Sequence, residues 1–208
     1  MVGVDSSHGM LAVAGDLSRD VDFQLADAGN LPFGDGAFDA VTCGLSLSHF
    51  PELEAALGEI RRVLRPGGCF VASAWGEGSR FPTRVLGELL DRYAGPSGKD
   101  VLDEETWLHA EQGTSVLRRA GFPEVSVTSE SFDGGFADAE EALAWALGWP
   151  LTAARLRHLE PTHREQFRRE SLQALGSSSL TWSFAFNFYL ARKSSARGGK
   201  SQSALAAS

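Results

Sequence analysis

The sequence has few of the features that mark secreted proteins. Only two of its 208 residues are cysteines, Cys43 and Cys69, and they have no C-x-x-C spacing. Cys43 falls late in one expected strand and Cys69 at the start of its expected parallel neighbour, too far apart for a disulfide. So few cysteines, without a framework of paired spacings, indicate a reduced, cytoplasmic protein.

The chain also lacks long apolar runs and an excess of positive charge. Its apolar stretches are only as long as strands, so no transmembrane span is expected, and Asp5 interrupts the first apolar stretch too early for a signal peptide. Lys and Arg number 19 against 27 Asp and Glu, a net charge of −8. Because no basic stripe is present, we expect neither nucleic acid nor a membrane surface as a partner.

Strand and helix patterns alternate through the first half of the chain. Strands are expected, in chain order, at Val2–Asp5, Asp22–Leu25, Phe38–Leu45 and Cys69–Ala74. A helix after Pro51 is expected to end at Pro66-Gly67-Gly68, and its apolar face carries Leu53, Leu57, Ile60 and Leu64. This alternation predicts an α/β fold with a mostly parallel sheet covered on both faces.

The second half is richer in helices and aromatic residues. Helices are expected at Phe81–Tyr93, Glu104–Glu111, Thr114–Ala120, from the N-cap Asp138 through Trp149, and at Pro161–Leu175. Val125–Thr128 alternates like an exposed or edge strand, and Leu180–Leu190 is a long β-type run. We expect one domain over residues 1–193, with helical elements near 81–120 and 137–175 covering the substrate, and a disordered tail at 194–208.

Four segments then stand in a fixed order. They are Val4-Asp5-Ser6-Ser7 with Met10-Leu11, Ala26-Asp27-Ala28 with Leu31-Pro32-Phe33, Phe38-Asp39-Ala40-Val41, and Glu59-Ile60-Arg61-Arg62-Val63-Leu64-Arg65-Pro66-Gly67-Gly68. Together they resemble a class I S-adenosylmethionine-dependent methyltransferase of the small-molecule kind (methyltransferase type 11), related to ubiquinone and menaquinone C-methyltransferases. The resemblance implies a Rossmann-like sheet of order 3-2-1-4-5-7-6 whose last strand is antiparallel.

The same resemblance implies S-adenosylmethionine as the cofactor and gives roles to two carboxylates. Asp5, with Ser6 beside it, would bind the ribose hydroxyls, and Asp27 would accept a hydrogen bond from the exocyclic amine of adenine. The backbone N–H of Ala28 would meet a ring nitrogen, and Met10 would pack against the adenosine. The alternatives that remain are a helix N-cap for Asp5 and a turn residue for Asp27.

The end of the Phe38–Leu45 strand is implied to line the reactive side of the cofactor. Cys43, Gly44 and Leu45 would border the methionine part and the transferred methyl group, since open α/β sheets bind ligands at the carboxyl ends of their strands. His49 follows four residues later and is a candidate catalytic base, with a surface or loop-packing histidine as the alternative.

Two further patterns do not indicate sites. His158 and His163 are five residues apart and lie on different helix faces, so no metal site is expected. Tyr189 and Lys193 match the Y-x-x-x-K spacing of short-chain dehydrogenases, but that pair needs a helix, and here it follows a β-type run.

The family's first strand and glycine-rich loop have no counterpart ahead of Asp5 in this sequence. Three explanations stay open: a start placed too late, a unit supplied by another chain, or a non-catalytic remnant. With that strand missing, we expect Val2–Asp5 to run parallel to Asp22–Leu25, with its other edge beside Phe38–Leu45 or empty. An unpaired edge of this kind would also suit a homo-oligomer, because an exposed edge pairs with other strands.

The leading hypothesis is therefore S-adenosylmethionine-dependent methyl transfer to a small-molecule substrate that the sequence does not name. The alternative is a truncated or non-catalytic methyltransferase-like module that binds a partner.

Overall fold

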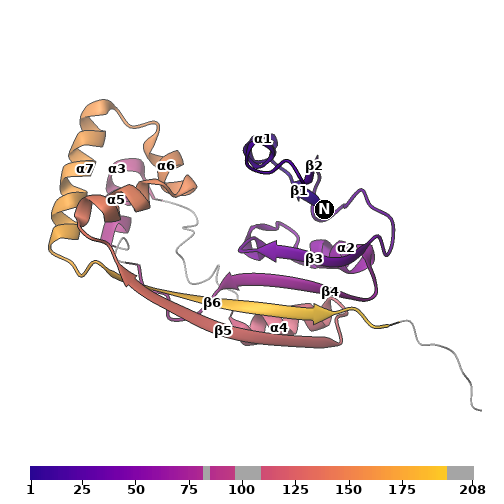
Figure 1. The fold of residues 1–208 in the computed structure, drawn as a ribbon. Coiled ribbons are helices and arrows are strands. Elements are labelled where there is room, and N and C mark those ends of the chain that lie inside the picture. Colours follow the sequence, from indigo (N-terminus) through magenta and orange to yellow (C-terminus); the bar gives the residue numbers. More distant parts are fainter. Residues whose placement is uncertain (82–84, 97–108, 196–208) are drawn as a thin grey trace, which may run out of the picture. The chain divides into compact units, whose positions relative to one another are not determined.

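The computed structural model describes residues 1–81, 85–96 and 109–195, and in it the chain forms two compact units (Figure 1). Unit 1 consists of Met1–Ala72, Gly113–Val127 and Tyr189–Ser208, and unit 2 of Ser73–Gln112 and Thr128–Phe188. Most of the helix expected at Glu104–Glu111 and most of the expected tail lie outside the described residues.

The N-terminal segment of unit 1 is a small β-α-β arrangement. Strand β1 (Val2–Asp5) pairs in parallel with β2 (Asp22–Leu25), in the register Val2 to Asp22 through Asp5 to Leu25, as predicted. Helix α1 (His8–Leu17) connects them and begins at the N-cap Ser7, whose Oγ accepts a hydrogen bond from the Met10 N–H. No residue of α1 is buried, and Leu17 is 83% exposed. This helix therefore presents apolar side chains to solvent.

A second, four-stranded sheet has the order β3-β4-β6-β5. Its strands are β3 (Phe38–Gly44), β4 (Leu64–Trp75), β5 (Glu124–Gly135) and β6 (Thr181–Arg192). The arrow of β6 points opposite to those of β4 and β5 (Figure 1). Among the described residues no strand is hydrogen-bonded between β1 and β3. The two sheets reproduce the predicted order with its first strand left out, so the predicted fold class is confirmed.

Helix α2 (Leu53–Val63) packs its apolar face into the core of unit 1. Leu57 and Ile60 are buried as their helical spacing predicts, and Val63 is buried as well. The predicted end of this helix is wrong, because Leu64 already begins β4 and Pro66-Gly67-Gly68 lies within that strand. Proline disfavours helical backbone at the residue before it, so the chain leaves the helix one turn early. The Lys193 ammonium then donates to the Leu64 carbonyl.

The rest of the unit 1 core lies around helix α4 (Ala110–Arg119) and the sheet. The Phe70 and Phe122 rings stack with centroids 6.1 Å apart, and both are fully buried. Tyr189 is 1% exposed and lies against Gly113 of α4. Tyr189 thus lies in a strand and in the core, and the Lys193 ammonium donates to backbone carbonyls at the end of α2. The two residues therefore do not form the helical Tyr–Lys pair of a short-chain dehydrogenase.

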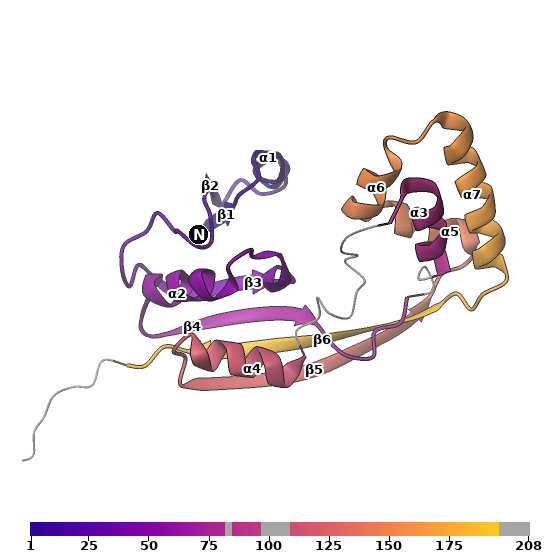
Figure 2. The ribbon, with the colours of Figure 1, turned by 180° about the vertical axis from the view of Figure 1, so that it is seen from behind.

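Unit 2 gathers four helices around a leucine-rich core (Figure 2). They are α3 (Gly87–Ala94), α5 (Ala139–Leu147), α6 (Pro150–Leu156) and α7 (Pro161–Gly176). Asp138 is the N-cap of α5, as predicted, and its Oδ1 accepts from the Glu141 N–H at 2.9 Å. The helix expected to continue through Trp149 instead ends at Leu147, because Gly148 caps it and Pro150 starts the next helix.

The helices of the described residues are too short or too polar to cross a bilayer.

Candidate functional site

The carboxyl ends of β1, β2 and β3 border one cavity of about 470 Å³ in unit 1. Because parallel strands end at the same edge of a fold, polar residues at those ends converge there. The cavity brings together seven of the residues singled out from the sequence: Asp5, Ser6, Asp27, Ala28, Cys43, Gly44 and His49. Met10 and Leu45 do not line it, and Met10 is 59% exposed on α1.

Asp5 stands at the end of β1 and holds the turn into α1. Its Oδ1 accepts a hydrogen bond from the Ser7 N–H at 2.8 Å. The N-cap of α1 is Ser7, so the expected alternative of Asp5 as the helix N-cap is wrong. Asp5 instead stabilises the turn just before the helix. The second carboxylate oxygen, Oδ2, accepts no hydrogen bond from the described residues. One oxygen thus stabilises the turn, and the other keeps an unused acceptor on a residue that lines the cavity.

Asp27 repeats this arrangement at the end of β2. Its Oδ1 accepts from the Gly29 N–H at 2.8 Å, and its carbonyl accepts from the Asn30 N–H at 2.9 Å. A smaller cavity of about 190 Å³ adjoins the main one here, with Asp27, Ala28, Phe50 and Pro51 lining both. The turn role and a ligand role are therefore compatible, because they use different oxygens of the same carboxylate.

The end of β3 combines a small neutral residue with a strained one. Burial raises the pKa of the Cys43 thiol, and the Ser46 backbone N–H offsets this only in part, so the thiol stays protonated at neutral pH. Leu45 has a φ of +52°, the left-handed region that a branched side chain adopts only where its surroundings enforce it. Backbone strain of this kind is concentrated at functional sites. The Ser46 hydroxyl donates to the Gly44 carbonyl at 2.9 Å and stabilises this bend.

His49 ends the short 3-10 helix η1 (Leu47–His49) that follows β3, and it borders the same cavity. Leu47 of the same helix is 2% exposed and anchors it to the core. The position of His49 is thus set by the packing of Leu47, two residues before it. In the described parts of the chain, no three His, Cys, Asp or Glu side chains come close enough to hold a metal ion.

Sequence reasoning missed the clamp that holds the loop beside this cavity. The Arg62 guanidinium donates to the Leu31 and Phe33 carbonyls and also binds both oxygens of Glu59. A Glu59 oxygen in turn accepts from the Leu31 N–H at 2.8 Å. The hydrogen bond from Arg62 holds the pKa of Glu59 below its usual value. The i, i+3 spacing of Glu59 and Arg62 on α2 was the available signal, but their loop partners Leu31 and Phe33 are 28 to 31 residues away.

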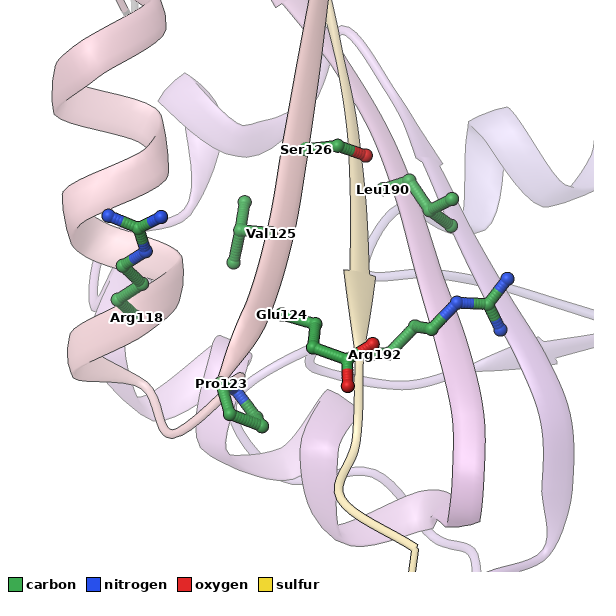
Figure 3. Close-up of a pocket in the computed structure, with 7 residues that line it drawn as sticks. All are labelled: Arg118, Pro123, Glu124, Val125, Ser126, Leu190 and Arg192. Carbon is green, nitrogen blue, oxygen red and sulfur yellow. The ribbon is translucent and has the colours of Figure 1, made fainter.

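A second hollow in unit 1 lies at the edge of the sheet (Figure 3). It has a volume of about 300 Å³, and Figure 3 shows Val125 on the side of Arg118, with Glu124 and Arg192 on the other side of β5. None of the residues expected to bind a cofactor lines it. It is therefore not the candidate site. The strand order places β5 at one edge of the sheet, in agreement with the exposed or edge strand that the alternation at Val125–Thr128 predicts.

Comparison with known proteins finds similarity to methyltransferases. Residues 1–72 match the methyltransferase domain family. A demethylmenaquinone methyltransferase of Staphylococcus saprophyticus is 34% identical over 152 residues, which are 66% of this chain and 64% of that protein. A 2-phytyl-1,4-naphthoquinone methyltransferase of Synechococcus elongatus is 41% identical over 73 residues, 32% of this chain and 31% of that protein. The chain thus spans less than two thirds of these curated relatives.

Solved structures show the same fold at low identity. The YcgJ protein of Bacillus subtilis gives a TM-score of 0.56 at 17% identity, covering 94% of this chain and 82% of its own. A SAM-dependent methyltransferase of Thermotoga maritima gives 0.52 at 18%, covering 92% and 72%. The [4+2]-cyclase SpnF gives 0.51 at 23%, covering 94% and 67%.

The protein therefore has the fold of the class I S-adenosylmethionine-dependent methyltransferases. Residues 1–72, about a third of the chain, match the methyltransferase domain family. This match and the fold class agree with what the four sequence segments implied.

Proposed function

We propose that this chain transfers a methyl group from S-adenosylmethionine to a small molecule with a quinone-type aromatic ring. The single observation that carries the proposal is the cavity where β1, β2 and β3 end, because it unites two carboxylates, small residues and a histidine. The acceptor class is supported by the names of the two relatives, which both act on quinones.

In this proposal the two aspartates recognise the two halves of the adenosine. Asp5 Oδ2 accepts from the ribose hydroxyls, and Asp27 Oδ2 accepts from the exocyclic amine, while Oδ1 of each keeps its turn. Hydrogen bonds to a charged acceptor are about twice as strong as neutral ones, which suits recognition of a diol and an amine. The Ala28 N–H, at the edge shared by both cavities, meets a ring nitrogen.

The residues after β3 serve the reacting end. When bound, S-adenosylmethionine supplies a methyl group on a sulfonium, and the chain contributes positioning and the exclusion of water. Cys43 and Gly44 border this end as small, uncharged residues, and the neutral thiol does not compete as a nucleophile. His49 is proposed to take the acceptor's proton on an imidazole nitrogen.

Isothermal titration with S-adenosylhomocysteine tests the cofactor part. We expect saturable binding that Asp5→Ala weakens by roughly 10- to 150-fold, the loss of a charged hydrogen bond of about 1.5–3 kcal/mol. Absence of binding by the wild-type chain would contradict the assignment. Mass spectrometry of a reduced naphthoquinone incubated with cofactor then separates catalysis from the rival binding-only module, which predicts binding without a methylated product.

We also propose that the protein works in a reducing compartment, the cytoplasm. Cys43 and Cys69 are both free thiols. Labelling of both thiols in unfolded protein from freshly lysed cells is the expected result, and a disulfide or mixed disulfide at either would argue against it.

A further inference from the structure

Unit 2 carries a group of aromatic side chains beside its helical core, and one of them, Trp145, also packs against that core. We call it the aromatic cluster, and its members are Trp75, Phe81, Trp145, Trp149, Phe184 and Phe186. They come from the end of β4, the segment after it, helix α5, the N-cap of α6 and strand β6. Residues far apart in the sequence thus supply rings to one place.

The alternation of β6 explains how this cluster forms. Successive side chains of a strand point to opposite faces, so Trp182, Phe184, Phe186 and Phe188 share one face. Ser183 and Asn187 on the other face are 7% and 4% exposed. One face of β6 is therefore buried, and the other presents an unbroken row of aromatic rings.

The rings contact one another in many orientations. Trp75 lies 4.9 Å from Phe186 and 6.1 Å from Trp149, between ring centroids. Phe81 stacks on Trp145 at 6.0 Å, with an angle of 22° between the rings, and Trp145 stacks on Phe184 at 5.8 Å and 19°. Such offset and tilted pairs are the favoured aromatic geometries, and the cluster is held by them.

Burial separates this cluster from the hydrophobic core of the same unit. Phe167 and Leu143 in that core are 2% and 1% exposed. Every ring of the cluster is only half-buried. Each ring therefore keeps part of its surface open to solvent.

The tryptophans also bring unused hydrogen-bond donors. Among the described residues, no acceptor is recorded for the indole N–H of Trp75, Trp145 or Trp149, and none of these nitrogens is among the buried unpartnered atoms. A buried indole N–H would need a partner, so these donors reach solvent. The cluster itself contains no charged residue. Flat apolar faces with a few outward N–H donors suit a planar, uncharged ring system that carries carbonyl or hydroxyl oxygens.

We infer that the aromatic cluster binds the ring of the methyl acceptor, a fused two-ring quinone or its hydroquinone. This inference rests on the proposed function for the acceptor class but concerns binding alone. The acceptor ring stacks against Trp75 and Trp149, and an indole N–H donates to one of its oxygens. These two residues then determine specificity for flat aromatic acceptors over aliphatic ones.

Equilibrium dialysis of the full chain with 2-methyl-1,4-naphthoquinone tests this inference. Trp149→Leu and Trp75→Leu keep an apolar side chain and remove the ring and its N–H. Each is expected to weaken binding about 10-fold, from the loss of one stacking contact and one hydrogen bond. Phe188→Leu is the matched control, because Phe188 shares the face of β6 but is 41% exposed and lies at the margin, with its ring 6.3 Å from Phe186. Its affinity should not change.

Melting temperatures and titration with S-adenosylhomocysteine accompany each variant. Unchanged quinone affinity in both tryptophan variants would overturn the inference, as would equal weakening by Phe188→Leu. Failure of the wild-type chain to bind the quinone would also overturn it, whether another part of the chain or a protein partner covers the cluster. The cofactor titration reports on the proposed function separately. A chain that binds the quinone but not S-adenosylhomocysteine would refute the proposed function and leave the quinone-binding inference standing.

Discussion

The replacement of Asp27 by asparagine tests the proposed cofactor site more sharply than a deletion of the side chain. Asp27 Oδ1 accepts from the Gly29 N–H at 2.8 Å, so an asparagine oxygen can keep this bond and hold the turn. Its NH₂ group must then occupy the position of Oδ2. At that position the wild type offers a charged acceptor to the adenine amine, whereas the variant offers a second donor. We therefore expect Asp27→Asn to fold normally and to lose cofactor affinity.

The magnitude follows from the bond that is removed. A hydrogen bond to a charged group contributes about 1.5–3 kcal/mol, so the dissociation constant of S-adenosylhomocysteine should rise roughly 10- to 150-fold. The assay is isothermal titration of the wild type and the variant, with thermal unfolding as the check on folding. A matched ligand sharpens it: in S-inosylhomocysteine an oxygen replaces the amine, so the asparagine NH₂ gains an acceptor. Asp27→Asn should thus prefer the inosine analogue, and the wild type the adenosine. Equal affinities of both proteins for both ligands would show that Asp27 is only a turn residue.

Two further predictions concern stability in unit 1. Arg62 lowers the pKa of Glu59 in the folded state, so this pair stabilises the fold above the unfolded pKa of about 4.3, and the contribution is lost as the pH falls through the lower folded value. In urea titrations Glu59→Gln should therefore destabilise the protein at pH 7, and its difference from the wild type should shrink as the pH falls through the lowered folded pKa of Glu59; a difference independent of pH would refute the charge argument. Gly113→Ala should destabilise the protein by about 1–3 kcal/mol, because the new methyl group overlaps the buried Tyr189 ring and this outweighs the better helix propensity. A methyl group added at Gly58 in α2 meets no other atom within 4 Å, so Gly58→Ala should stabilise the protein by up to about 1 kcal/mol. In chemical unfolding the two substitutions should change the free energy of unfolding in opposite directions, and a change in the same direction would contradict this reasoning.

Local periodicity was enough to predict most of the fold. The helical spacing of Leu57 and Ile60 identifies the buried face of α2 correctly, because that pattern is set by geometry within one element. Element ends were less predictable. The break after Leu147 depends on whether Gly148 caps a helix or continues it, and the start of β4 at Leu64 depends on contacts from Lys193 far along the chain.

The candidate site was likewise predictable only in part. Carboxylates that directly follow parallel strands must meet at one edge, which is why Asp5 and Asp27 could be placed in one cavity from the sequence alone. Leu45 and Met10 could not be placed from the sequence. The position of Leu45 depends on a strained turn, and that of Met10 depends on what packs against α1, where Met10 is 59% exposed. The Arg62 clamp was missed because its backbone partners in the 31–33 loop have no side-chain signal.

The turn and ligand interpretations of the aspartates are not exclusive, and this changes what an experiment must separate. Each carboxylate uses one oxygen for its own loop, so loss of folding and loss of binding would be confused in an alanine variant but not in an asparagine variant. The acceptor raises a separate question, because a fold does not define its chemistry. SpnF shares this fold to a similar extent and is described as a [4+2]-cyclase. Cofactor binding through Asp27 and acceptor binding through Trp149 are therefore measured on different units, and only methylated product joins them into a methyltransferase.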